Sequence, residues 1–398
     1  MAAGAKNTNP SVSAACSGSL EASQSIPSAL FEGPCARTDE ELDNAFKALA
    51  ADNLFSGAVL IAKDGRPLFQ GAYGAASREY SIPNTVDTQF NLASAGKMFT
   101  AVSIAQLVEQ GRLSYDDTID KFLDETWLDP EIAKKITVSN LLSHTGGLSG
   151  YFNERYIESS RLLFREVKDF KPLVVDSALS FEPGSQWSYS NTGFLLLGAI
   201  IESVTGQDYP DYIKEHIFIP AGMTRTAPLD LDHINHGYAQ GYARKPDREL
   251  PNGNPPKNPD YRTMVTVMAE RTRLANSYNP IFTNNILDHV VRGGPGGGSF
   301  STVLDMLSFL EALKRGDHVS KETVALLTSP KPMSPEYGYG MQLVDGAYGH
   351  SGGFLGISTM TLSYPDGYEM IVFSNIDWGS QVAIDKMLEL AGYKPPKR

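Results

Sequence analysis

Strand-like runs, in which apolar residues alternate with polar ones or follow one another, lie near both ends of this 398-residue chain. Near the N-terminus, GAVLIAK and RPLFQGAYG flank a Lys-Asp-Gly-Arg turn at 63–66, which predicts a β-hairpin. Near the C-terminus, similar runs recur between 337 and 375, with a Pro-Asp-Gly turn at 365–367. We therefore expect the two terminal segments to meet in one antiparallel sheet.

Helical periodicity occupies much of the remaining sequence. A capping box at 38–41 begins an amphipathic helix that is expected to end near Asn53. A polar stretch rich in Asn, Pro and Tyr, at 228–292, is expected to form long loops with short strands and part of a cleft wall. Further helices are predicted from Ser94 to Gly111 and over 191–206, 301–316 and 380–392.

Together these elements predict an α+β fold, an α/β sandwich in which helices flank the antiparallel sheet. Residues 38–90 and 293–398 would form one discontinuous α/β domain, and 91–292 an inserted, mainly helical domain with long loops. Residues 1–37, rich in Ser and Ala, are expected to form a flexible N-terminal leader. A cleft between the two domains is the natural place for a functional site.

Net charge and the lengths of the apolar runs limit the kinds of partner that the chain can bind. A net charge of −12 argues against nucleic acid, because phosphate binding needs a basic surface. No apolar run reaches the roughly 18 residues of a transmembrane helix. No intact signal peptide is visible. The expected location is periplasmic or secreted, with the cytoplasm as the alternative. Pairing of Cys16 with Cys35 is left open, as is the oligomeric state.

Candidate chemistry begins with Ser94 and Lys97, the one S-x-x-K of the chain. On a helix this spacing puts both side chains on one face, a turn apart. A serine nucleophile needs a base, an oxyanion hole and a proton source for the leaving group. Two other short elements could supply them, Tyr189-Ser190-Asn191 and His350-Ser351-Gly352.

The order and wide spacing of these elements resemble the S-x-x-K, Y-x-N and K/H-x-G motifs of the penicillin-recognising serine hydrolases. This family includes class C β-lactamases, D-Ala-D-Ala carboxypeptidases and β-lactamase-like esterases. The stretches at 141–148, 181–202 and 296–310 resemble the family as well, and the resemblance runs from about Asp39 to the C-terminus. It implies a β-lactamase/transpeptidase-like fold, a small-molecule or peptide substrate, and a covalent acyl-enzyme on Ser94 without any cofactor.

The catalytic residues implied are Ser94, Lys97 and Tyr189. A nearby ammonium is expected to lower the pKa of Tyr189, and the sequence leaves open which of Lys97 and Tyr189 is the base. Asn191 is expected to hold Lys97 and the substrate.

The oxyanion hole would consist of the N–H groups of Ser94 and, by resemblance, Gly353. Gly352 and Gly353 would let the substrate approach the backbone closely. His350 replaces the lysine of typical class C enzymes, and its charge is expected to be conditional, because imidazole titrates near neutral pH. The resemblance therefore favours small esters and D-amino-acid peptides, with at most slow β-lactam turnover.

Several alternatives compete with this interpretation. The chain could be a catalytically silent penicillin-binding or regulatory member of the fold. Ser351 lies in a G-x-S-x-G pattern, but the strand-like sequence after it argues against a nucleophile elbow.

His144-Thr145-Gly146 also matches H-x-G, and a structural role in a loop is favoured there. For Glu182, a possible separate base, an exposed loop position is preferred. His233 and His236 lack the companions of a metal site, and no metal is expected.

Overall fold

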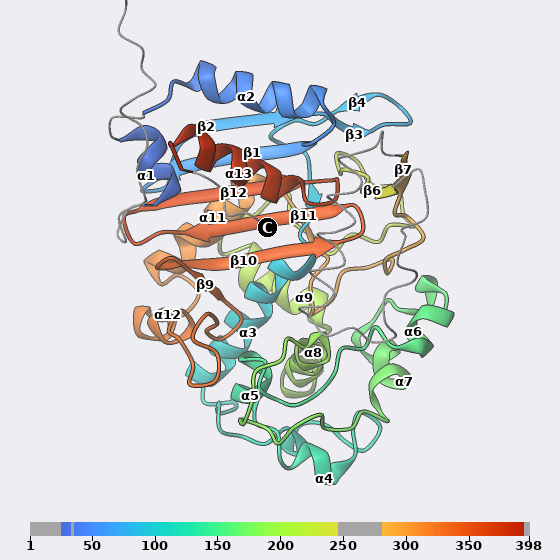
Figure 1. Cartoon of the computed structure of the whole chain (residues 1–398). Helices are drawn as coiled ribbons and strands as arrows, with labels where there is room; N and C mark the ends of the chain where they lie inside the picture. Colours follow the sequence, from blue (N-terminus) through green and yellow to red (C-terminus); the bar gives the residue numbers. More distant parts are fainter. Residues whose placement is uncertain (1–24, 33–35, 246–280, 394–398) are drawn as a thin grey trace, which may run out of the picture.

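The computed structural model describes residues 25–32, 36–245 and 281–393. Its centre is a six-stranded antiparallel sheet with the order β2-β1-β12-β11-β10-β9 (Figure 1). Strand β1 pairs with β12 from Gly57 opposite Ser374 to Lys63 opposite Tyr368, so the two ends of the chain meet at the middle of the sheet, as predicted. The strands are β1 (Gly57–Lys63), β2 (Arg66–Tyr73), β9 (Gln342–Val344), β10 (Ala347–Phe354), β11 (Ile357–Ser363) and β12 (Tyr368–Ser374).

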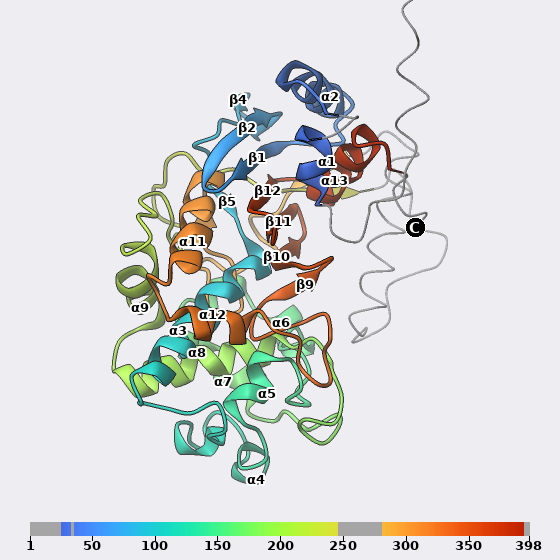
Figure 2. The ribbon, with the colours of Figure 1, turned by 90° about the vertical axis from the view of Figure 1, so that its left-hand side faces the viewer.

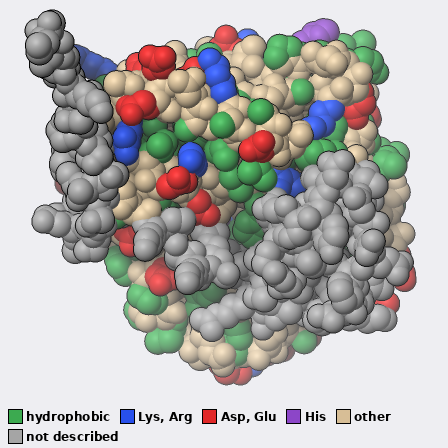
Figure 3. Space-filling view, turned by 45° about the horizontal axis from the view of Figure 1, so that its top comes forward, with side chains coloured by type: hydrophobic (Ala, Val, Ile, Leu, Met, Phe, Trp, Pro, Cys, Tyr) green, Lys and Arg blue, Asp and Glu red, His purple; other side chains and the backbone are tan. Residues whose placement is uncertain are grey.

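Each face of the sheet has its own apolar core. Val59 and Ile61 of β1 pack beneath α1 (Ile26–Phe31), α2 (Asp39–Ala51) and α13 (Gly379–Leu390). Leu60, of opposite parity, belongs to the larger core on the side of α11 (Val303–Arg315). Figure 2 shows the sheet between α13 and α11. On the face over α2, acidic and basic side chains are interspersed (Figure 3).

A mainly helical part lies below the sheet in Figure 1, around the contact of α3 (Lys97–Glu109) with the apolar helix α8 (Asn191–Thr205). Short elements surround this pair: η3 (Ile119–Lys121), α4 (Pro130–Ala133), α5 (Val138–Leu142), α6 (Glu154–Glu158), η4 (Arg161–Leu163), η5 (Val167–Phe170), α7 (Lys171–Val174), α9 (Tyr209–Ile213), η6 (Lys214–Phe218) and α12 (Lys321–Leu327). The small pairings are β3 (Ala75–Ser77) with β4 (Ile82–Pro83), β5 (Phe90–Asn91) with β8 (Phe300–Ser301), and β6 (Tyr242–Lys245) with β7 (Ile281–Asn284).

Helix α1 departs from the expected flexible leader. The Ser25 hydroxyl caps it by accepting a hydrogen bond from the Ser28 N–H at 3.0 Å, and Leu30 is fully buried. A helix of six residues is unstable alone, so this one depends on burying its apolar side in the core shared with α13. Cys16, Cys35 and residues 246–280 of the predicted loop region lie outside the described residues.

Candidate active site

Ser94 lies on a tight turn between a strand and a helix. Strand β5 leads into the 3₁₀ turn η2 (Ala93–Gly96), and α3 begins directly after it at Lys97. The side-chain oxygen of Asn91 accepts a hydrogen bond from the Ala93 N–H at 2.8 Å and supports the left-handed conformation of Ala93, whose φ is +44°. The predicted helix therefore starts three residues later than expected, but it still carries Lys97 next to Ser94.

Lys97 is fully buried, and its ammonium group has three oxygen partners. Nζ lies 3.2 Å from Ser94 Oγ, 2.7 Å from Asn191 Oδ1 and 2.6 Å from the Gly296 carbonyl oxygen. None of these partners is a carboxylate, and burial lowers the pKa of Lys97 to about 7. Near neutral pH the amine therefore exists in protonated and neutral forms beside the serine.

The Gly296 carbonyl belongs to a glycine-rich loop that sequence reasoning did not connect with Lys97. The Thr100 hydroxyl lies 2.8 Å from the Pro295 carbonyl oxygen, which ties the loop to α3. Pro295 packs on α8 where Gly198 leaves room, because a Cβ at Gly198 would lie 2.0 Å from Pro295 Cγ. The glycine-rich run at 293–298 was the available signal, and the sequence interpretation used only 296–310, as a stretch that resembles the family.

Tyr189 and Asn191 reach the site from the start of α8. The Ser190 hydroxyl accepts a hydrogen bond from the Gly193 N–H at 3.2 Å and so fixes the first turn of this helix. Lys97 Nζ lies 5.0 Å from the centroid of the Tyr189 ring. The structure therefore brings Ser94, Lys97, Tyr189 and Asn191 together from segments about a hundred residues apart in sequence.

His350 completes this group from β10, but not as the expected switchable cation. Its ring is buried, with Nε2 2.9 Å from the Tyr337 hydroxyl and Nδ1 2.5 Å from the Ser351 carbonyl oxygen. Burial, and then the charge of Lys97, lower the pKa of His350 to about 3. The contacts fit a neutral ring that carries its proton on Nδ1 and accepts from Tyr337 at Nε2. The expectation of a conditional charge near neutral pH is therefore wrong.

Gly352 and Gly353, two of the three glycines of β10, differ in what they accommodate. A Cβ at Gly352 would lie 2.0 Å from the Leu92 carbonyl oxygen, so this glycine lets the chain just before Ser94 pack against the strand. The expected space for substrate at Gly352 is therefore filled by the protein's own backbone. Gly353 is exposed, and a Cβ there would meet no atom of the described residues within 4 Å. Only Gly353 has the open surroundings that an approaching substrate requires.

His144 packs on Tyr189, a contact that sequence reasoning missed. It follows α5 in a left-handed conformation (φ +59°), so the expectation of a loop that closes a helix is met. Its Nδ1 accepts a hydrogen bond from the Ser190 N–H at 3.2 Å, and its ring centroid lies 4.2 Å from that of Tyr189. Burial, followed by the charges of Lys97 and His350, holds the pKa of His144 well below its usual range. A neutral imidazole therefore supports the Tyr189 ring.

The competing residues occupy unrelated places. Ser351 lies within β10 and is followed by β11, so the strand-to-helix turn of a nucleophile elbow is missing. Glu182 is exposed, and its carboxylate lies 4.0 Å from Lys135. His233 is also exposed. Within residues 25–32, 36–245 and 281–393, no group of three or more His, Cys, Asp or Glu side chains is arranged to hold a metal ion.

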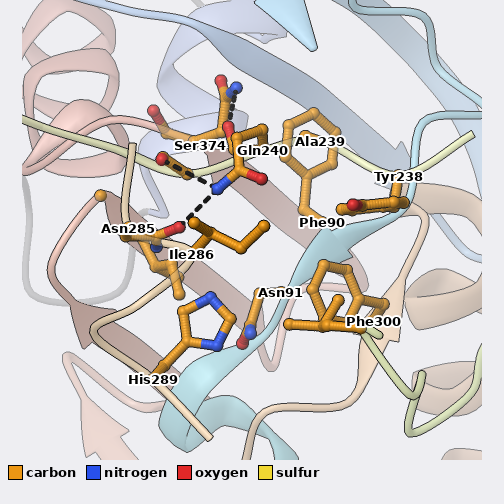
Figure 4. A pocket seen from close by; sticks show the side chains of 15 residues that line it. Phe90, Asn91, Tyr238, Ala239, Gln240, Asn285, Ile286, His289, Phe300 and Ser374 are labelled. Carbon is orange, nitrogen blue, oxygen red and sulfur yellow. Dashed lines mark hydrogen bonds between the residues drawn. The ribbon is translucent and has the colours of Figure 1, made fainter. Parts of the chain in front are cut away.

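A small enclosed cavity lies behind strand β5, away from the Ser94 hydroxyl. Phe90, Asn91, Gln240, Asn285 and His289 are among the residues around it (Figure 4). Its volume of about 10 Å³ is roughly that of one water-sized sphere, so it cannot hold a substrate. Gly353 of β10, by contrast, is exposed and has open surroundings.

Comparison with known proteins identifies the family of this chain. A family model described as Beta-lactamase matches residues 42–390. Penicillin-binding protein 4* of Bacillus subtilis (strain 168) is 29% identical over 353 residues, which cover 84% of this chain and 71% of that protein. The crystal structure of a penicillin binding protein from Bacillus halodurans matches with a TM-score of 0.72 and 28% identity, over 87% of this chain and 99% of that one.

A D-stereospecific amidohydrolase from Streptomyces sp. matches with a TM-score of 0.66 and 26% identity, over 88% of this chain and 98% of that one. The chain therefore belongs to the beta-lactamase family of serine hydrolases. The resemblance seen in the sequence and the predicted fold class are both confirmed. No helix in the part of the chain that the structure describes has the length and apolar character needed to cross a membrane.

Proposed function

We propose that this protein hydrolyses esters or amides through a covalent acyl-enzyme on Ser94. The observation that carries the proposal is the 3.2 Å contact between Ser94 Oγ and the Nζ of Lys97, whose pKa is lowered to about 7 by burial. A neutral amine at this distance can take the serine proton, directly or through Tyr189.

The reaction would proceed in two halves. Ser94 Oγ attacks the substrate carbonyl carbon while its proton passes to the Lys97–Tyr189 pair. The oxyanion that forms accepts hydrogen bonds from the N–H groups of Ser94 and Gly353. The stored proton then moves to the departing alcohol or amine, and the acyl group stays on Ser94. Water, deprotonated by the same pair, attacks the ester, releases the acid and restores the serine.

The motif His350-Ser351-Gly352 affects the class of substrate that the site can bind. Because the His350 ring is neutral, it offers no fixed positive charge for a substrate carboxylate. The site is therefore suited to uncharged esters and to amides such as those of D-amino acids, more than to β-lactams or peptides that end in a free carboxylate. The similarity to a D-stereospecific amidohydrolase supports amide substrates.

Labelling with a fluorophosphonate, followed by mass spectrometry of the tryptic peptide, tests the proposal. We expect one adduct, on Ser94, and loss of both the adduct and p-nitrophenyl ester hydrolysis in Ser94→Ala. Ser351→Ala is the matched control and is expected to keep the adduct. An adduct that persists in Ser94→Ala would refute the proposal, and an unreactive wild-type protein would favour the alternative of a catalytically silent binding member.

A further inference from the structure

Two phenylalanines from opposite sides of the site lie next to each other. Phe354 ends strand β10, and Phe152 lies in the loop between α5 and α6. Their ring centroids are 6.0 Å apart, with 32° between the ring planes. Phe152 is 36% exposed, so one side of this pair is open to solvent. We call Phe152 and Phe354 the aromatic wall.

The aromatic wall lies beside the reacting centre. Side chains alternate along a strand, so Phe354 projects from the same face of β10 as Gly352, which packs against the Leu92 carbonyl just before Ser94. On the other side, a Cβ at Gly296 would lie 3.5 Å from the Tyr151 hydroxyl. The Gly296 carbonyl oxygen is one of the three oxygen atoms around the Lys97 amine. Tyr151, the residue next to Phe152, therefore lies close to that amine.

The position of the aromatic wall along β10 indicates which part of the substrate it would contact. His350, in the middle of β10, has its ring centroid 6.4 Å from that of Tyr189, one of the groups proposed to return a proton to the leaving group. Phe354 lies four residues further along β10, beyond Gly353, a span of about 13 Å at the rise of a strand. In the proposed reaction the leaving group would depart on the His350 side, and the acyl group would extend toward Phe354.

The chemistry of the wall is apolar. The rings that contact Phe152 are those of Tyr151 at 4.7 Å, Tyr156 at 5.0 Å and Phe354, and none of these side chains carries a charge at neutral pH. Burial raises the pKa of Tyr151 above that of a free phenol, which keeps this ring neutral as well. Such a surface gains free energy by covering an uncharged ring or long alkyl group and discriminates against an anionic one.

We propose that Phe152 and Phe354 select substrates whose acyl group carries an uncharged aromatic ring. The inference rests on the proposed function, because it assigns the acyl side of the Ser94 site. Arylacetyl esters and amides are thus the favoured class, ahead of those with acetyl or anionic acyl groups.

Two esters with one leaving group test this selectivity: p-nitrophenyl phenylacetate and p-nitrophenyl acetate. We expect wild type to prefer phenylacetate by about tenfold or more in kcat/KM, since a few methylene-sized contacts suffice for that ratio. Phe152→Ala and Phe354→Ala should each lower the ratio by about tenfold, whereas Phe152→Tyr keeps it. Tyr80→Ala, which removes a ring that is 81% exposed and lies on the turn between β3 and β4, should leave it unchanged. A ratio unaffected by both alanine changes would overturn the proposal.

A binding measurement separates this inference from the proposed reaction. In the Ser94→Ala protein, calorimetry should show phenylacetamide binding at least about tenfold more tightly than acetamide, and Phe354→Ala should abolish that difference. Equal binding of the two amides would refute the role of the aromatic wall. Absence of Ser94-dependent hydrolysis in the wild type would instead refute the acyl-enzyme proposal and leave the binding result to decide the wall.

Discussion

The Tyr337 hydroxyl lies 2.9 Å from Nε2 of His350 and fixes the orientation of a histidine that the sequence suggested would be a pH-dependent cation. Tyr337 belongs to the segment before β9, thirteen residues ahead of its partner. The ring centroids of the two residues are 5.7 Å apart, with the planes perpendicular. In the neutral ring with its proton on Nδ1, Nε2 accepts this hydrogen bond from the Tyr337 hydroxyl.

Tyr337→Phe is expected to destabilise the protein by about 1–3 kcal/mol, because a buried acceptor on His350 loses its donor. Urea denaturation measures this change in the free energy of unfolding. In a His350→Leu background the same substitution should cost clearly less, since there the acceptor has already been removed. Equal costs in both backgrounds would show that the two side chains are not coupled.

Stability should depend on pH below neutrality. The folded-state pKa of His350, about 3, lies below the ordinary value of 6.5, so the unfolded chain binds the proton first. The free energy of unfolding should therefore fall as the pH decreases from 6.5 toward 3, with a smaller fall in His350→Asn. His233→Asn, at an imidazole that is 69% exposed, serves as the control. Parallel curves for wild type and His350→Asn would contradict the assignment.

Activity should rise as the pH increases through about 7, because Lys97 must lose its proton before it can accept that of Ser94. The profile of kcat/KM for a p-nitrophenyl ester between pH 5 and 9 reports this titration. Lys97→Arg keeps a permanent cation at the position and should lower kcat/KM by about a hundredfold or more. Comparable activity in Lys97→Arg would exclude Lys97 as the proton acceptor.

Asn191→Asp should shift that profile toward alkaline pH. A carboxylate in place of the amide oxygen, which lies 2.7 Å from Lys97 Nζ, stabilises the ammonium form. The shift expected for such a pair is about 1–3 pH units. Asn53→Asp introduces the same charge at an exposed position outside the site and should leave the midpoint in place. An unchanged midpoint in Asn191→Asp would mean that another group controls the rate.

Alanine at Gly352 and alanine at Gly353 should differ in their effect on folding. Gly352→Ala forces a methyl group against the Leu92 carbonyl oxygen and is expected to cost about 1–3 kcal/mol, together with activity, because the chain before Ser94 must move. Gly353→Ala, which points into open space, should fold as stably as wild type in thermal denaturation. Similar melting temperatures for the two variants would contradict the packing described here.

The sequence predicts the structure correctly where the local pattern and the tertiary contacts favour the same element. Alternation and turns predicted the strands, and Ser94, Lys97, Tyr189 and Asn191 lie together as their motifs suggested. The roles of these residues remain predictions until they are tested.

Other features could not be predicted because they depend on distant contacts. The Gly296 carbonyl that holds Lys97 is a backbone group, and the glycine-rich run at 293–298 does not show which carbonyl would face the amine. The neutrality of His350 follows from its burial beside Tyr337, which single-residue chemistry does not include. Helix α1 is too short to be indicated by periodicity and is stabilised by the core that it covers.

The pairing of β1 with β12 also has a consequence during synthesis. The Ser374 hydroxyl donates to the Ser56 carbonyl oxygen across a separation of 318 residues. When β1 leaves the ribosome, the strand that covers one of its edges has not yet been made. The edge of β1 that pairs with β12 must remain open until translation is almost complete. The nascent chain therefore needs protection from aggregation, and closure of the sheet is a late, slow event.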